Sequence, residues 1–406
     1  MSRESEADLP GEPLLPGALP EALRAELVAF RRDLHMHPEL GNQEFRTTAA
    51  IKARLERAGL EPRVLSIGTG LICDIGDPDD VRPMLALRAD IDALPIPDTK
   101  SDCTYRSTVP DRAHACGHDI HTAVVLGAGL VLADLHAQGL LPRRVRLIFQ
   151  PAEEVLPGGA PDAIESGVLE GVGRIVGVHC DPRVDAGRIG LRHGAITSAC
   201  DRLEVSLDGA GGHTARPHLT TDLVTAAARV VTDVPALVAR RVDARSGLSV
   251  TWGRIESGHA CNVIPQHAEL SGTIRCLDLD AWRAAPDLVH AAIDEIANLY
   301  RAKSEINYIR GVPPVVNDAA VTELLRDAMT ARRGAHSIED TEQSLGGEDF
   351  SWYLEHVPGA MARLGVRPPG DRTTRDLHRG DFDADEYAIT VGVEMFTAAA
   401  LLDERD

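Results

Sequence analysis

One short stretch of the chain, "HACGHDIHTA", gathers a cysteine and three histidines that could do chemistry: His114, Cys116, His118 and His121. Thiolates and imidazoles bind Zn²⁺ or another divalent metal such as Mn²⁺ or Co²⁺. A chance cluster, a redox thiol, a structural zinc clip and a catalytic metal site are the alternatives that this stretch alone leaves open. A structural clip usually carries paired ligands, and the sequence has no C-x-x-C.

Further candidate ligands follow short strand-like segments elsewhere in the chain. Glu153 and Glu154 follow "RVRLIFQPA", and His179 follows "RIVGV". In open α/β sheets the functional crevice lies beyond the carboxyl ends of the strands, so these groups can converge with the cysteine–histidine cluster. The paired glutamates fit a metal hydrolase, in which one carboxylate binds the metal and a free one accepts a proton from water.

A cysteine nucleophile is the main rival to the metal site. Cys116 precedes a predicted helix, where its thiol could be acidified and paired with a histidine base. That hypothesis predicts activity that survives chelators, and it leaves Glu153, Glu154 and His179 unexplained.

The elements that must position these residues alternate along the first half of the chain. Helical spacing over 21–37 and 43–58 is followed by strand-like runs and helices in alternation up to residue 180. This order predicts an α/β fold, a mostly parallel sheet flanked by helices. From residue 198 the pattern becomes strand, helix, strand, strand, helix, strand, which predicts an inserted α+β domain.

We therefore expect four segments along the chain. Residues 1–20 form a disordered lead-in, 21–197 and 312–406 form the two parts of the larger domain, and 198–311 form the inserted domain.

Composition excludes several classes of partner. A net charge of -20 argues against nucleic acid and against an anionic membrane surface. The acidic, proline-rich N-terminus lacks the basic start and apolar core of a secretory signal. With seven scattered cysteines, this predicts a cytoplasmic protein with reduced thiols.

The chain also resembles the aminoacylase-type metallopeptidases, in particular the branch of hippurate hydrolases, N-acyl-L-amino acid amidohydrolases and auxin-conjugate amidohydrolases. The motifs that carry the resemblance occur in the family's order from about residue 31 to 386. They are "RRDLHMHPELGNQEFRT", "ALRADIDALPI", "HACGHDIHTA", "FQPAEE", "GVHCDP", "GGHTARPH", "NVIP", "GTIR", "GGEDF" and "DLHRGDFDADE".

The resemblance implies a ligand set for two divalent metal ions, Zn, Mn or Co, with the Cys116 thiolate bridging them. The implied ligands are Cys116, His118, Glu154, His179 and His378. Glu153 would be the general base and later the proton donor. Asp90 would orient a ligand, while His114 and His121 would be structural.

The resemblance gives the inserted domain a dimerisation role. His213 would reach the partner subunit's site and stabilise an oxyanion. Asn262 and Arg275 would contact the substrate, with the guanidinium holding a carboxylate. Glu348 and Asp349 would line the cleft without an assigned role.

The implied activity is metal-dependent hydrolysis of the amide bond of an N-acyl-L-amino acid or a similar conjugate, by a homodimer. The alternatives are a dipeptidase or carboxypeptidase on the same scaffold, or a catalytically silent metal-binding protein. The sequence does not identify the acyl group, the amino acid or the metal.

Overall fold

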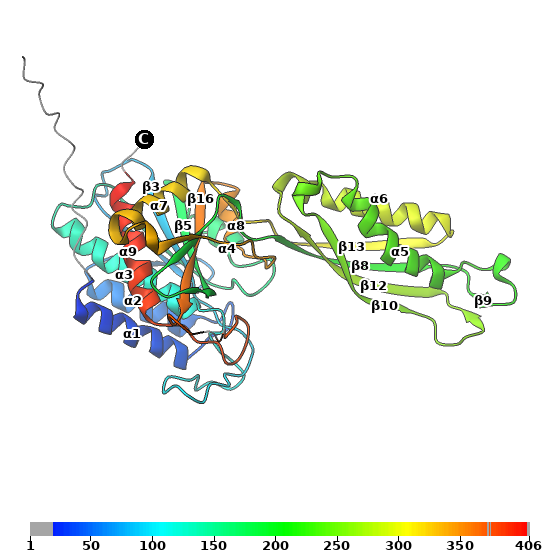
Figure 1. The fold of residues 1–406 in the computed structure, drawn as a ribbon, viewed down its shortest axis with the longest axis horizontal. Helices are drawn as coiled ribbons and strands as arrows, with labels where there is room; N and C mark the ends of the chain where they lie inside the picture. The colour runs from blue at the N-terminus through cyan, green and yellow to red at the C-terminus, as the bar shows by residue number, and fades with distance from the viewer. Residues whose placement is uncertain (1–18, 372, 374, 404–406) are drawn as a thin grey trace, which may run out of the picture.

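The computed structural model describes residues 19–371, 373 and 375–403 of the chain. Of the predicted lead-in, residues 1–18 lie outside the described residues. The described chain forms a larger and a smaller lobe, each built around its own sheet (Figure 1). The domain boundaries that the sequence predicts stay a prediction.

The helices and strands follow one another in the order that the sequence pattern indicates. The helices are α1 (Glu21–Met36), α2 (Phe45–Arg57), α3 (His118–Ala137), α4 (Ala160–Glu165), α5 (Leu223–Ala239), α6 (Leu279–Leu299), α7 (Ala319–Arg333), α8 (Ser351–Leu354) and α9 (Tyr387–Leu402). The strands are β1 (Arg63–Val64), β2 (Leu71–Ile75), β3 (Met84–Asp90), β4 (Val145–Gln150), β5 (Val172–Asp185), β6 (Ile189–Leu191), β7 (Gly194–Ala195), β8 (Ala199–Asp208), β9 (Gly212–His213), β10 (Ser249–Ser257), β11 (Val263–Ile264), β12 (His267–Cys276), β13 (Lys303–Val312), β14 (Val316–Asn317), β15 (Ile338–Asp340) and β16 (Gly359–Arg367).

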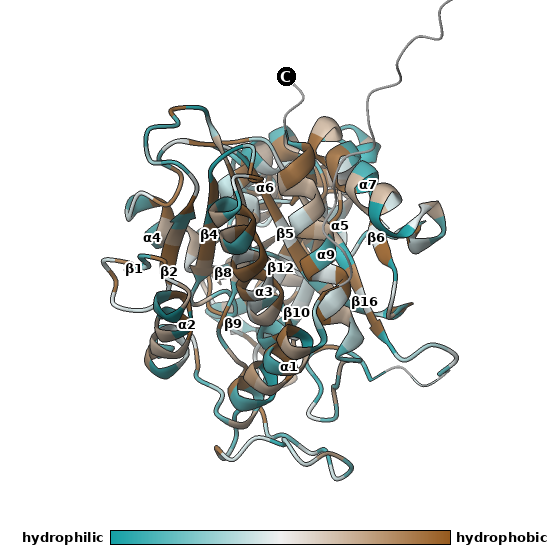
Figure 2. Cartoon of the chain, turned by 90° about the vertical axis from the view of Figure 1, so that its left-hand side faces the viewer, coloured by the Kyte–Doolittle hydropathy of each residue, from teal (hydrophilic) through white to brown (hydrophobic). Residues whose placement is uncertain are grey.

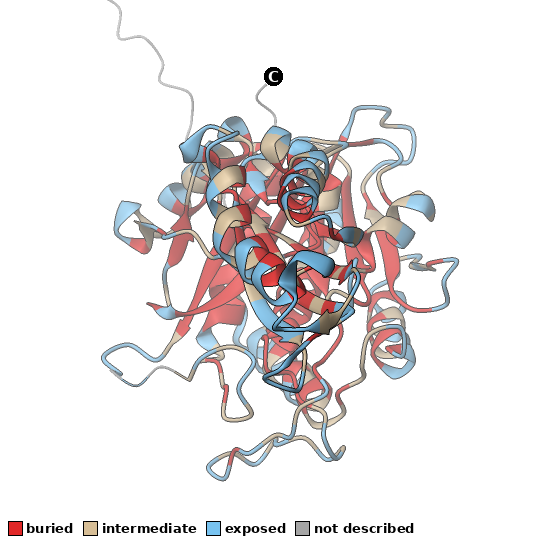
Figure 3. Cartoon of the chain, turned by 90° about the vertical axis from the view of Figure 1, so that its right-hand side faces the viewer, coloured by how far each residue is buried: buried red, intermediate tan, exposed pale blue. Residues whose placement is uncertain are grey.

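The larger lobe is built on an eight-stranded sheet with the order β1-β2-β4-β3-β5-β16-β6-β15. Its centre, β4-β3-β5-β16, is parallel, whereas β1 with β2, β2 with β4, and β16 with β6 pair antiparallel. The predicted α/β class is confirmed. A short turn between β1 and β2 explains why these two strands pair antiparallel, and the pairs β2–β4 and β16–β6 make the rest of the sheet mixed. Figure 3 shows the strands of this sheet largely buried, with exposed residues on loops and outer helix faces.

Helix α3 is the central helix of the larger lobe. It packs against β3, β4, α1 and α9, and most of its side chains are buried. Figure 2 shows its apolar colouring in the middle of the domain. Among the described residues α3 is the one helix long and apolar enough to cross a membrane, but 72% of its apolar window is buried inside the structure. Its apolar character therefore matches its place in the core.

The smaller lobe is a four-stranded antiparallel sheet with the order β10-β12-β8-β13. Along β8, buried Leu203, Val205 and Leu207 alternate with more exposed residues, as expected of a strand with one covered face. Helices α5 and α6 pack on the covered face and form a second core with it.

We predict that Leu147→Ala will lower the free energy of unfolding by about 2–5 kcal/mol, because it leaves a cavity between the sheet and α3. Leu147 on β4 is fully buried, and a Cβ on Gly129 of α3 would lie 2.3 Å from its Cδ1. Urea unfolding followed by circular dichroism measures the change. Leu140→Ala is the matched control: Leu140 is 48% exposed, so its loss should change stability by less than about 0.5 kcal/mol.

Candidate metal centre

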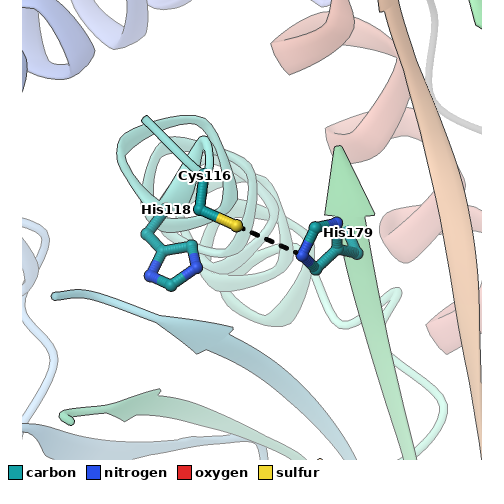
Figure 4. Close-up of side chains that lie close together, drawn as sticks. All are labelled: Cys116, His118 and His179. Atoms are coloured by element: carbon teal, nitrogen blue, oxygen red, sulfur yellow. Dashed lines mark hydrogen bonds between the residues drawn. The ribbon is translucent and has the colours of Figure 1, made fainter. Parts of the chain in front are cut away.

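The start of α3 positions Cys116 and His118. Gly117, between them, has a φ of 86°, in the left-handed region that favours glycine. A Cβ at this position would lie 2.6 Å from the Sγ of Cys180, so the close approach also requires glycine. The turn directs the sulfur of Cys116 toward His179, which lies midway along β5 because that strand continues beyond the end expected from the sequence (Figure 4).

His179 presents one nitrogen to the thiol. Its Nδ1 donates a hydrogen bond of 2.8 Å to the carbonyl oxygen of Cys180, so Nε2 carries the lone pair. That Nε2 lies 3.5 Å from the Sγ of Cys116 (Figure 4). Burial, followed by the charge of Arg363, holds the pKa of His179 well below its usual range, which keeps the ring neutral, as a metal ligand must be.

Glu154 and His378 approach the same thiol from two other segments. Glu154 follows β4, and its backbone N–H donates to Oδ2 of Asp92 at 3.0 Å. Its Oε1 lies 3.4 Å from Nε2 of His378 and 3.9 Å from Nε2 of His118. The backbone N–H of His378 donates to the carbonyl oxygen of Ala115 at 2.8 Å, which ties the C-terminal segment to the start of α3.

The five residues form two groups of possible ligands that share Cys116. In one group Cys116, His118 and His179 offer ligand atoms within 4.8 Å of one another, and in the other Cys116, Glu154 and His378 do so. Nε2 of His118 and Oε1 of Glu154 are buried without a hydrogen-bond partner among the described residues. Buried polar atoms of this kind need partners, and a cation in each group would supply them. The residues therefore fit two cations with a bridging sulfur.

The electrostatics of the centre favour positive charge. Burial by itself lowers the pKa of His118, but Asp90, Asp92 and Glu154 outweigh it and raise the pKa to about 10, so the ring carries a proton that a metal ion at Nε2 would displace. Burial, with Glu154 and Glu153, raises the pKa of the Cys116 thiol well above its usual range. A free thiolate nucleophile needs the opposite shift, whereas a coordinating metal ion deprotonates a thiol outright.

Glu153 lies beside the ligands. Its Oε2 is 3.9 Å from Nε2 of His118. Burial, then the charges of Glu348 and Glu154, raise its pKa well above the usual range of a carboxyl group. It is absent from both groups that contain Cys116, and it offers a carboxylate oxygen within 4.8 Å of ligand atoms of His118 and Glu154, close enough for proton transfer to or from a water molecule held there.

The carboxylate that holds His118 belongs to Asp92, which the sequence places at the same strand end as Asp90 but to which the resemblance gives no role. His118 Nδ1 lies 3.2 Å from Oδ1 of Asp92 and donates to it, which leaves Nε2 for a metal. Asp90 instead accepts from Nδ1 of His121 at 2.6 Å, and its Oδ2 lies 3.7 Å from Nε2 of His118. The role of ligand orientation that the resemblance implies for Asp90 stays a prediction. The signal for Asp92 is its place two residues beyond Asp90, just past the end of β3.

His121 is held on both sides. Its Nε2 accepts a 2.9 Å hydrogen bond from the backbone N–H of Cys180, while Nδ1 donates to Asp90. His114 is also buried, and burial lowers its pKa to about 4. Neither ring belongs to a group that contains Cys116.

A buried arginine connects the sheet to Glu348 and Asp349, whose role the sequence left open. Arg88 on β3 donates to Asp90 at 2.8 Å and to Asp349 at 2.7 Å, and it lies 3.2 Å from Glu348. Asp349 also accepts from Gln150 at 2.7 Å, at the end of β4. These two acidic residues therefore position the strand ends, and they face Glu153 within 4.8 Å.

The structure does not bring all predicted site residues to the cluster. His213 and Asn262 are exposed and lie together, because β9 pairs with β11 and the N–H of Thr214 donates to the carbonyl oxygen of Asn262 at 3.2 Å. Figure 1 shows β9 at the end of the smaller lobe farthest from the large sheet. Arg275, on β12, donates to the carbonyl oxygen of Leu345 at 2.9 Å, close to the segment that carries Glu348.

Comparison with known proteins places the chain in a family. The model of peptidase family M20/M25/M40 matches residues 86–402. The chain belongs to this family. It is accordingly a metal-dependent amidohydrolase, and its centre takes two divalent metal ions.

Three proteins illustrate the similarity. A solved structure of a dinuclear metal binding peptidase of the M20 family from Bacillus subtilis has a TM-score of 0.81 and 35% identity, over 94% of this chain and 98% of that one. The N-acetyl-L-cysteine deacetylase of Bacillus subtilis (strain 168) is 38% identical over 367 residues, 90% of this chain and 85% of that protein. A Rhodococcus jostii (strain RHA1) protein that bears the name of a glutamate–cysteine ligase is 46% identical over 380 residues. The chain spans only 47% of that protein's length.

We predict that Asp92→Asn will weaken metal binding by about 10–100-fold, because His118 loses the carboxylate that fixes its ring. Competition with a chromophoric chelator measures the affinity. Asp201→Asn is the control: Asp201 is also fully buried, but it bonds Trp282 and Tyr308 in the smaller lobe. Unchanged affinity in Asp92→Asn would contradict the orienting role of Asp92.

Proposed function

We propose that this enzyme hydrolyses the amide bond of an N-acyl-L-amino acid and releases a carboxylic acid and an amino acid. One observation carries the proposal: two ligand groups share Cys116, and the Glu153 carboxyl group lies beside them outside both. That arrangement combines the two components of metal-assisted amide hydrolysis, cation sites and a free base. Similarity to the N-acetyl-L-cysteine deacetylase supports an acylated amino acid as the substrate class.

In this proposal the ligands are Cys116, His118, Glu154, His179 and His378. Zn, Mn or Co bound there would activate a water molecule and polarise the scissile carbonyl group. Glu153 accepts a proton from the attacking water. It donates that proton to the leaving nitrogen as the C–N bond breaks. The raised pKa of Glu153 makes its carboxylate a stronger proton acceptor than that of an ordinary glutamate, and it lets the carboxyl group hold the proton until the nitrogen leaves.

We further propose that the enzyme works as a homodimer in which His213 acts in the partner's site. His213 is exposed, and its Nδ1 accepts a 3.0 Å hydrogen bond from the backbone N–H of Ala215. Nε2 is thus the protonated nitrogen and can donate to an oxyanion. The position of β9, far from the same chain's metal centre, supports action between subunits (Figure 1).

Arg275 and Asn262 would recognise the amino acid part of the substrate. The Arg275 guanidinium would hold the α-carboxylate, since its planar fork matches a carboxylate. Asn262 lies beside His213 and would contact the substrate in the same partner site.

A cytoplasmic location completes the proposal. The seven described cysteines are all free of disulfides, which fits a reducing compartment and keeps the Cys116 thiol available to a metal.

Glu153→Gln should retain both metal ions and lower kcat by about 10²–10⁴-fold, because the amide cannot accept the proton from water. Metal content is measured by elemental analysis, and turnover with N-acetyl-L-methionine. Glu165→Gln, an exposed glutamate on α4, should behave as the wild type. A Glu153→Gln enzyme that hydrolyses substrate at nearly the wild-type rate would refute Glu153 as the base.

If His213 acts in the partner's site, two inactive variants should restore activity to each other in a mixed dimer. Neither Glu153→Gln nor His213→Ala dimers should be active, but a heterodimer of the two chains, isolated with two different affinity tags, should recover about half of the wild-type activity. One of its two equivalent sites then combines Glu153 from one chain with His213 from the other. If His213 served its own chain's site, both sites of the heterodimer would be defective and activity would stay near zero.

A further inference from the structure

Arg363, on β16 of the large sheet, is a buried charged residue that has no role in the proposed mechanism. Its side chain is buried, with the residue 5% exposed, and both Nε and Nη2 lack a hydrogen-bond partner within the described chain. No carboxylate of the described residues lies within ion-pair distance of it. Burying an unpaired guanidinium is costly, so the fold retains a group that needs an anionic partner.

The unpaired edge of Arg363 carries the pair of donors that binds a carboxylate. The Nε–Nη2 edge is the one that holds carboxylates elsewhere in this chain: Arg183 binds Asp181 with it at 3.0 and 2.8 Å, and Arg32 binds Glu386 at 2.8 and 2.7 Å. Two parallel N–H donors on a planar edge match the two oxygens of a carboxylate. In Arg363 this same edge is free.

Its place in the sheet puts Arg363 beside the metal centre. Arg363 is opposite His179 in the parallel pairing of β16 with β5, so the two side chains leave the same face of the sheet on adjacent strands. The charge of Arg363 also acts on His179, and Cys116 acts on Arg363. The free edge therefore belongs to the surroundings of the ligands.

The acidic residues near Arg363 already have partners. Asp181 and Glu348 are the carboxylates that act on it. Asp181 is held by Arg183 through two hydrogen bonds, and Glu348 lies 3.2 Å from the Arg88 guanidinium. Two dications on the neighbouring ligands would add positive charge next to Arg363, which strengthens its need for an anion from outside the chain.

We propose that Arg363 binds a second carboxylate of the substrate, in addition to the α-carboxylate assigned to Arg275, and so makes the enzyme selective for dicarboxylic N-acyl amino acids. This inference rests on the proposed function. The second carboxylate can come from the acyl chain, as in an N-succinyl group, or from the amino acid side chain, as in glutamate. Both present the same chemistry to the guanidinium.

Three substrates separate the sources: N-acetyl-L-methionine, N-succinyl-L-methionine and N-acetyl-L-glutamate. The wild type should show a higher kcat/KM for one of the two dicarboxylic substrates than for N-acetyl-L-methionine. Arg363→Met should lower kcat/KM for that substrate by about 10–100-fold, mainly through KM, and change the monocarboxylic substrate less than about threefold. Arg363→Lys should recover part of the preference, because it keeps the charge and loses the fork.

Arg367→Met is the matched control. It removes the same charge from the same strand, but Arg367 already donates to Asp185 at 2.7 Å, so the preference should not change. Thermal unfolding of the metal-loaded enzyme gives a readout that does not depend on activity. Arg363→Met should melt no lower than the wild type, because it removes an unpaired buried charge.

Three outcomes would overturn the inference. The first is an equal loss of activity in Arg363→Met on all three substrates, and the second is a melting temperature that falls further than in Arg367→Met. The third is a change in kcat/KM caused by Arg363→Met that depends only on the α-carboxylate of the substrate, which a comparison of N-acetyl-L-methionine with its amide would show. A wild type that cleaves free-amine dipeptides and none of the N-acyl substrates would refute the proposed function itself, and the inference with it.

Discussion

The buried surplus of carboxylates at one edge of the large sheet is the constraint on which the structure of the site depends. Asp90, Asp92 and Asp349 are almost fully buried there, and Glu153 and Glu154 lie close by. Arg88 neutralises only part of this charge. Buried acids at such density repel one another unless cations lie among them. Two divalent ions in the groups that share Cys116 would balance this negative charge. The same carboxylates raise the pKa of His118, because they favour its positively charged form.

The fold meets this constraint by joining strand ends to the start of one helix. Asp90 ends β3 opposite Gln150, which ends β4, so Asp92 and the two glutamates follow from the same level of the sheet. The start of α3 contributes Cys116 and His118. The almost wholly apolar remainder of α3 anchors those two residues in the core. The same helix therefore contributes to the core and positions two of the proposed metal ligands.

How much could be predicted from the sequence follows from how local each signal is. Cys116 and His118 are two residues apart, and Glu153 and Glu154 are adjacent, so their types and spacing mark them as candidates, while the role of each is implied by the resemblance. The partners of these residues are harder to predict from the sequence, because they lie far away along the chain. Asp92 and His118 are 26 positions apart, and Arg88 and Asp349 are 261 apart. The sheet is mostly parallel as predicted, but which of its pairs are antiparallel depends on which strands become neighbours, and the sequence does not show that.

Arg363 shows the limit most clearly. In the sequence it is an arginine within an apolar strand, "GAMARLGVR", and nothing nearby marks it. Only the pairing of β16 with β5 puts it beside His179, and only the full set of contacts shows that its Nε–Nη2 edge is free. Among the proposed catalytic groups, Cys116 with His118 and Glu153 with Glu154 lie next to one another in the sequence, which makes them visible without a structure. The selectivity that we propose for Arg363 depends on strands that meet only in three dimensions, so its role has to be sought in the structure rather than in a motif.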